Sequence, residues 1–159
     1  MVIHTHRGAI VASLSPEDAV DLFEARLALE PVVLQKAVRV AAPSDLERIR
    51  ACLSDYEKAV KGGADPETLS KLSWAFHIAL CKPANRPRMM TILLSLYTST
   101  DRYLRLQINR PAAKSRALVD HRNLFGAYEN KKSALAGKLS RAHITGAYGD
   151  VMKRLKAPK

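Results

Sequence analysis

The sequence SPEDAVDLFEARLALEPVVLQKA, residues 15–37, carries the signals of a long amphipathic helix and sets the pattern for the rest of the chain. Ser15 stands where an N-cap side chain accepts a backbone hydrogen bond, and Pro16 follows at the first helical position. Apolar residues then recur mostly at spacings of three and four, which places them on one face. They are Val20, Phe23, Leu27, Val33 and Ala37. We expect this helix to end near Ala42-Pro43.

Capping residues, prolines and glycines divide the remaining sequence into five further segments of helical character. These segments are residues 44–62, 65–83, 85–110, 113–129 and 131–155, with Asn130 expected to cap the last of them. No segment after residue 15 alternates between apolar and polar residues as a strand does. The sequence therefore predicts an all-α fold, an antiparallel bundle of about six helices joined by short loops.

The first 14 residues have a different character from the rest of the chain. Two short β-prone runs, residues 2–5 and 9–12, flank Gly8, which can supply a turn. So few residues do not make a stable sheet alone. We expect a short β-like N-terminal arm in front of the bundle.

Composition limits the class of protein. The chain has 159 residues, enough for one domain, and its apolar fraction of 47% argues against disorder. Lys and Arg (26) outnumber Asp and Glu (15), for a formal charge of +11, but the basic residues are scattered and favour a solvated surface over a nucleic-acid groove. Cys52 and Cys81 form neither a disulfide framework nor a zinc signature. With no apolar run of about 18 residues, we expect a cytoplasmic protein without membrane contact.

Three histidines stand in three different predicted helices: His77, His121 and His143. Imidazole is the commonest metal ligand among side chains, and three rings converging inside a bundle would leave coordination positions open. The alternative for each is an ordinary hydrogen-bonded histidine. Position 73, one turn before His77, is the natural place for a fourth ligand, but Ser73 offers only a neutral hydroxyl.

Five short motifs follow one another in a recognisable order: residues 24–30 (EARLALE), 74–77 (WAFH), 83–85 (PAN), 120–121 (DH) and 142–144 (AHI). Over about residues 16–155 the chain resembles the FCD domain, the all-helical, effector-binding C-terminal domain of GntR-type bacterial transcription regulators. The resemblance implies a homodimer and a small carboxylate effector. Residues 7–15 resemble the wing and linker of the winged-helix domain that precedes it, so we expect DNA binding only through a domain missing from this chain.

In many members of this family an acid or amide four residues before the first histidine completes a metal site. Ser73 departs from that pattern. Two interpretations remain open: a divalent metal (zinc, nickel or manganese) on the three histidines, or a polar pocket in which the histidines contact a ligand directly. Neutral imidazoles are needed for metal binding, so the affinity should fall below about pH 6.

Four further residues are candidates for ligand binding. Arg26 either clamps a carboxylate or pairs with Glu30 one turn later. Asn85 either contacts ligand or caps the following helix. Arg102 and Tyr103 are placed to reach the cavity from the fourth helix.

The function that these features favour is a ligand-sensing domain of a transcriptional regulator rather than an enzyme. An enzyme could use a metal on three histidines to activate water, but no glutamate or further histidine is spaced as a general base. Another alternative is a truncated partner that only dimerises with a full-length regulator.

Overall fold

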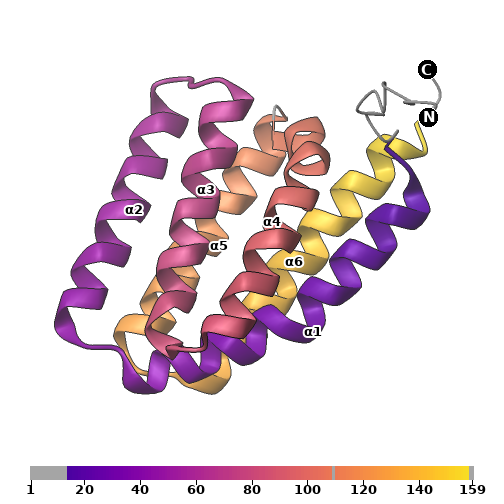
Figure 1. Ribbon diagram of the computed structural model, residues 1–159. Helices are drawn as coiled ribbons and strands as arrows, with labels where there is room; N and C mark the ends of the chain where they lie inside the picture. The colour runs from indigo at the N-terminus through magenta and orange to yellow at the C-terminus, as the bar shows by residue number, and fades with distance from the viewer. Residues whose placement is uncertain (1–13, 109, 158–159) are drawn as a thin grey trace, which may run out of the picture.

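The computed structural model describes residues 14–108 and 110–157, and within them it is all-α without strands. Its elements are α1 (Pro16–Val40), α2 (Pro43–Lys61), α3 (Pro66–Cys81), a short 3-10 helix η1 (Lys82–Ala84), α4 (Pro87–Ile108), α5 (Pro111–Glu129) and α6 (Ser133–Leu155). Successive α-helices run in opposite directions, so α1 begins and α6 ends at the same end of the bundle (Figure 1). The predicted antiparallel bundle is confirmed. The expected β-like arm lies outside the described residues.

The helix starts follow from their capping residues. Ser15 Oγ accepts a hydrogen bond from the backbone N–H of Asp18 at 3.0 Å, and Pro16 occupies the first turn. Asp65 Oδ1 accepts from the N–H of Thr68 at 2.9 Å and begins α3 in the same way. These side chains satisfy N–H groups that have no partner inside a helix, which fixes where each helix begins.

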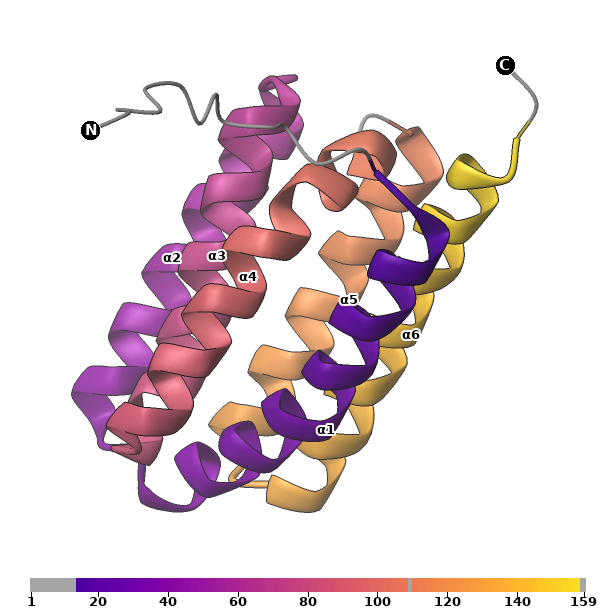
Figure 2. The ribbon, with the colours of Figure 1, turned by 45° about the vertical axis from the view of Figure 1, so that its right-hand side comes forward.

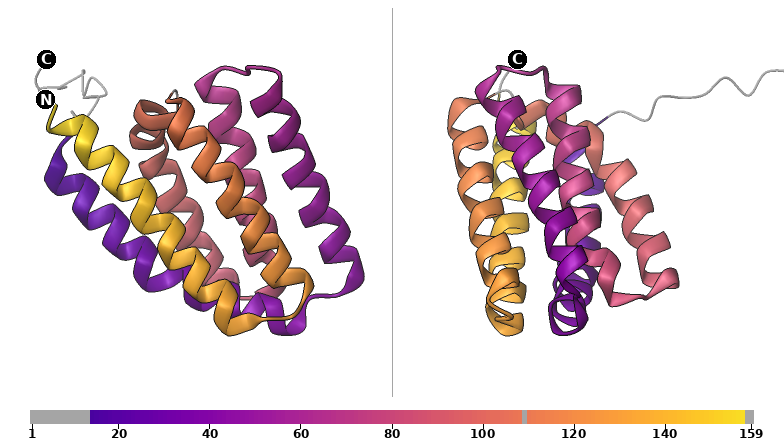
Figure 3. Two further views of the ribbon diagram at one scale, coloured as in Figure 1. Left: turned by 180° about the vertical axis from the view of Figure 1, so that it is seen from behind. Right: turned by 90° about the vertical axis from the view of Figure 1, so that its left-hand side faces the viewer.

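Helix α1 packs most extensively against α6, and the two lie side by side along their length (Figure 2). Gly137 leaves room for the side chain of Gln35 on α1, because a Cβ at that position would overlap it. Helix α2 is at the edge of the bundle, beside α3 and α5 (Figure 3). Phe23 and Leu34 from α1 and Leu124 from α5 are among the buried core residues, and each contributes roughly 1.5–3 kcal/mol by burial.

Pro31 lies inside α1 without ending it. A proline has no N–H to donate to the carbonyl four residues earlier, which here belongs to Leu27. Arg141 of α6 takes that place, since its Nη1 donates to the Leu27 carbonyl oxygen at 3.2 Å. The tertiary contact satisfies the acceptor that the proline leaves open, and α1 continues to Val40.

The expectation that Asn130 caps the sixth helix is wrong. Asn130 ends α5, where its backbone N–H and its side-chain amide both donate to the carbonyl of Gly126. Helix α6 begins three residues later, at Ser133. None of the described helices combines the length and the apolar character needed to cross a bilayer.

Candidate metal and ligand site

The structure brings the three predicted histidines together in the interior of the bundle. His77 comes from α3, His121 from α5 and His143 from α6, and all three are buried. Every pair of rings has a centroid separation of 5.1 Å. One nitrogen from each ring lies within 4.8 Å of the others, the arrangement of a potential metal site.

Two carboxylates orient two of these rings. Glu30 Oε1 lies 3.1 Å from Nδ1 of His77, and Asp120 Oδ2 lies 3.0 Å from Nδ1 of His143. Each contact leaves Nε2 as the free nitrogen of its ring. A carboxylate behind the imidazole fixes its orientation and raises its basicity, as is usual for histidines that bind metals. The sequence interpretation had considered Glu30 only as a partner of Arg26.

His121 lacks such a partner. Neither of its ring nitrogens forms a hydrogen bond within the described part of the chain, although the residue is fully buried. Tyr56 and Phe76 enclose it, each with a ring centroid 4.7 Å away. Buried polar atoms without partners are rare and costly in folded proteins, so this ring is positioned for a bond that a ligand or an ion would complete.

Charge in the site is concentrated on Arg26 and Glu30. Arg26 Nη2 and Nε donate to Glu30 Oε2 at 3.0 and 3.3 Å, and both side chains are 2% exposed. Burial alone would raise the pKa of Glu30, but Arg26 and His77 outweigh it and lower that pKa to about 2. The guanidinium also lies 4.9 Å from the ring centroid of Trp74, a cation–π contact. The carboxylate is therefore ionised and holds both neighbours in place.

The histidines are suited to bind metal in their neutral form. Burial lowers the pKa of His77, and burial together with the neighbouring His143 and His77 lowers the pKa of His121 well below its ordinary value. Nitrogens bound to one zinc at ~2.0–2.1 Å can be no more than ~4.2 Å apart, so the rings must close slightly around an ion. Ser73 is buried at the cavity wall but adds only a hydroxyl. The three histidines fit a divalent metal with open positions.

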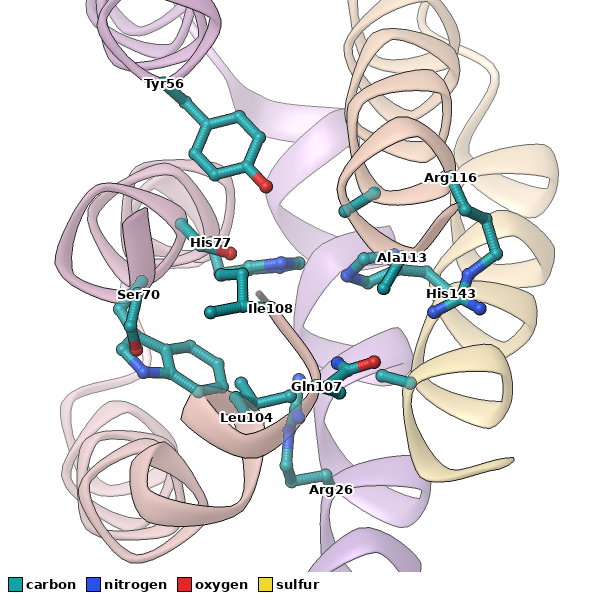
Figure 4. A pocket seen from close by; sticks show the side chains of 14 residues that line it. Arg26, Tyr56, Ser70, His77, Leu104, Gln107, Ile108, Ala113, Arg116 and His143 are labelled. Atoms are coloured by element: carbon teal, nitrogen blue, oxygen red, sulfur yellow. The ribbon is translucent and has the colours of Figure 1, made fainter. Parts of the chain in front are cut away.

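A cavity of about 30 Å³, room for one or two water molecules, is lined by His77 and His143 and is called the histidine cavity below (Figure 4). Four polar atoms of its lining residues have no hydrogen-bond partner among the described residues: Arg26 Nη1, Gln107 Oε1, the Tyr56 hydroxyl and Arg116 Nε. Gln107 and Tyr56 were missed by the sequence interpretation, because a lone glutamine or tyrosine inside a helix carries no motif.

The other three candidates lie outside the lining of this cavity. Arg102 pairs with Asp18 at 2.7 Å, and the Tyr103 hydroxyl hydrogen-bonds to the same carboxylate. Both residues therefore fasten α4 to the first turn of α1. Asn85 has a left-handed conformation (φ 49°) at the end of η1 and lines a surface hollow. It does not cap α4, which begins at Pro87.

Comparison with known proteins agrees with this architecture. Solved structures with the same fold include Streptococcus agalactiae GntR (25% identity, TM-score 0.74). The match covers 89% of this chain and 63% of the S. agalactiae chain. E. coli McbR/YncC (17% identity, TM-score 0.82) matches over 90% of this chain and 72% of its own. A structure described as a metal-free FCD domain (14% identity, TM-score 0.72) matches over 91% and 98%.

The chain thus spans less than two thirds of the S. agalactiae protein. No protein with a curated description matches by sequence. The family profile of the FCD domain matches residues 21–146, most of the described bundle. The chain belongs to the FCD domain family.

Proposed function

We propose that this domain senses a small carboxylate metabolite, which binds in the histidine cavity and widens it, beside a divalent metal held by His77, His121 and His143. The observation that carries the proposal is the set of buried polar atoms without partners that line one cavity. Leaving such an atom unsatisfied costs about 1–3 kcal/mol, and a ligand that satisfies several of them recovers that cost.

Arg26 supports a carboxylate as the ligand. Its Nε and Nη2 are occupied by Glu30, whereas Nη1 is buried and unpaired at the cavity. The two interpretations of this arginine are therefore compatible: it pairs within its helix and retains one donor for an anion. A bound metal would supply a Lewis-acidic centre whose open positions a carboxylate oxygen can occupy.

Longer relatives suggest how binding would be used. A ligand that favours one arrangement of the bundle shifts the domain toward it by its differential affinity. In a homodimer carrying winged-helix domains, that shift would change how the two domains meet DNA, a coupling between two sites. The homodimer, the DNA contact, a cytoplasmic location and the absence of an enzymatic activity are parts of this proposal, whereas the role as a regulator domain rests on the family.

Metal analysis of the purified protein tests the first step. We expect about one equivalent of divalent metal per chain after incubation with zinc, nickel or manganese, and its loss in His121→Ala. Leu124→Ala is the matched control, because Leu124 lies one turn away on the same helix, is equally buried, and offers no ligand. Metal retained by His121→Ala would contradict the assignment of the ligands.

Thermal unfolding with a panel of small carboxylates tests the second step. At a ligand concentration of 100 times Kd, stability should rise by about 2.7 kcal/mol. A panel that never shifts the unfolding temperature, with or without metal, would overturn the sensing function.

A further inference from the structure

Two surface hollows adjoin the histidine cavity from opposite sides. Ala113 and Arg116 line both the cavity and a hollow between α5 and α6, and that hollow continues to Arg110 and Lys153. On the other side Trp74 lines both the cavity and a hollow between α3 and α4. Either hollow is a potential entrance for a ligand.

We infer that small anions reach the cavity through the hollow between α5 and α6, where Arg110, Arg116 and Lys153 form an anion-collecting mouth. This inference rests on the proposed function, since it describes how an anionic effector would enter the same cavity. It is carried by two independent differences between the hollows, their charge and the nature of their inner walls.

The first difference is charge. The α5–α6 mouth has three cations and one carboxylate, Asp150, which pairs with Arg116 Nη1. Arg110 and Lys153 are exposed and form no ion pair within residues 14–108 and 110–157. Exposed cations around a concave entrance raise the local concentration of anions and speed their arrival.

The hollow between α3 and α4 has no such excess. Arg105 pairs with Asp101 at 2.7 Å and lies 3.5 Å from Glu67, which also pairs with Lys71 at 2.7 Å. Its two cations are thus matched by two carboxylates. An incoming anion would meet Asp101 beside the indole of Trp74, and like charges repel.

The second difference is the inner wall. Trp74 lies between the cavity and the α3–α4 hollow, and two contacts hold it in place. Its indole N–H donates to Asp101 at 3.0 Å, and its ring stacks on Tyr97 with centroids 4.5 Å apart. Moving it would break both contacts.

Ala113, which is small, and Arg116, which is flexible, line both the cavity and the α5–α6 hollow. Among the described residues Arg116 Nε forms no hydrogen bond, and it lies 3.9 Å from Asp120, too far for one. Gly146 on α6 leaves room for the guanidinium, since a Cβ there would be only 3.2 Å from Nε. A change of rotamer in Arg116 breaks its ion pair with Asp150 but moves no helix, and it opens the wall.

Trp74 is the single tryptophan of the chain and lines both the cavity and the α3–α4 hollow, so its fluorescence reports on quenchers that reach it from either side. Quenching by iodide, an anion, is compared with quenching by neutral acrylamide in metal-free protein. We expect Lys153→Glu to lower the iodide quenching constant about twofold and to leave acrylamide quenching unchanged. Lys71→Glu is the matched control, because it makes the same change of charge at an exposed lysine of the opposite hollow.

Iodide quenching that falls with Lys71→Glu and not with Lys153→Glu would show that the anion reaches Trp74 from the α3–α4 hollow, and it would overturn the inference. Equal quenching in all three proteins would overturn it as well. Since iodide is neither the effector nor a metal ligand in this assay, either result leaves the proposed sensing function to its own test.

Discussion

Glu30→Gln is the substitution for which the structure makes the sharpest prediction. The carboxylate is 2% exposed and accepts hydrogen bonds from Arg26, while its other oxygen contacts Nδ1 of His77. An amide keeps the shape of the side chain and removes its charge. The buried guanidinium of Arg26 then loses its only counter-charge within the described residues.

Two estimates of the stability lost in Glu30→Gln agree. The pKa of Glu30 falls from 4.5 to about 2 in the folded chain, and each pKa unit corresponds to about 1.36 kcal/mol, so its ionised form contributes about 3 kcal/mol. Removing one partner of a buried ion pair typically costs about 3–5 kcal/mol. For a chain of this length about 1 kcal/mol changes the unfolding temperature by 2–4 °C, so we expect a decrease of roughly 6–12 °C.

The dependence of this stability difference on pH follows from the direction in which folding shifts the pKa of Glu30. Because the folded pKa of Glu30 lies below the unfolded one, its contribution is complete above about pH 4.5 and is lost as the pH falls toward 2. The difference in stability between the wild type and Glu30→Gln should therefore shrink over that range in metal-free protein.

Urea unfolding followed by circular dichroism at pH 7 measures this difference. Glu129→Gln serves as the control, since it makes the same change in an exposed ion pair with Arg50 and should cost less than about 1 kcal/mol. If Glu30→Gln costs no more than Glu129→Gln, the buried carboxylate is not holding Arg26, and the reasoning is refuted.

Three further predictions concern the site and the core. Ser73→Asp should tighten metal binding at least tenfold in a titration, because it places a carboxylate one turn before His77; an unchanged affinity would mean that position 73 does not reach the ion. Tyr128→Phe removes a buried hydroxyl that has no partner among the described residues, so unfolding experiments should show stability unchanged or raised by about 1 kcal/mol; a clear loss would reveal a partner. Leu34→Ala should cost about 2–5 kcal/mol in urea unfolding, against a few tenths for Val32→Ala, which is 38% exposed; similar costs would contradict the packing.

The helical fold was predictable because its signals are local. Ser15 and Asp65 mark helix starts through contacts that span only three residues, and the structure has both. Asn130 was predicted to cap α6 but ends α5, because asparagine is common at either end of a helix. Its role is decided by packing at the turn, where the N–H of Lys132 returns to the carbonyl of Ala127 and keeps this segment with α5.

The three histidines of the site could be predicted from the sequence, but the carboxylates that orient them could not. The histidines were found from their residue type, their places in separate helices and the family resemblance. The roles of Glu30 and Asp120 depend on contacts with His77 and His143, which lie on other helices. Helix periodicity shows which residues share a face, but it does not show which faces of different helices meet.

Under the proposed function, the arrangement of these contacts makes α1 the helix that would transmit ligand binding. It carries Arg26 and Glu30 at the cavity, and its first turn is fastened to α4 by Asp18 through Arg102 and Tyr103. An anion that binds Nη1 of Arg26 would place a second negative charge beside Glu30 on the same guanidinium, so any rearrangement of that pair acts on the helix that holds both. Because α1 packs against α4 and α6, a shift along its axis must be accommodated at its first turn or at the α6 interface. A shift of α1 caused by ligand binding would thus be felt at the end of the bundle where the chain joins residues 1–13.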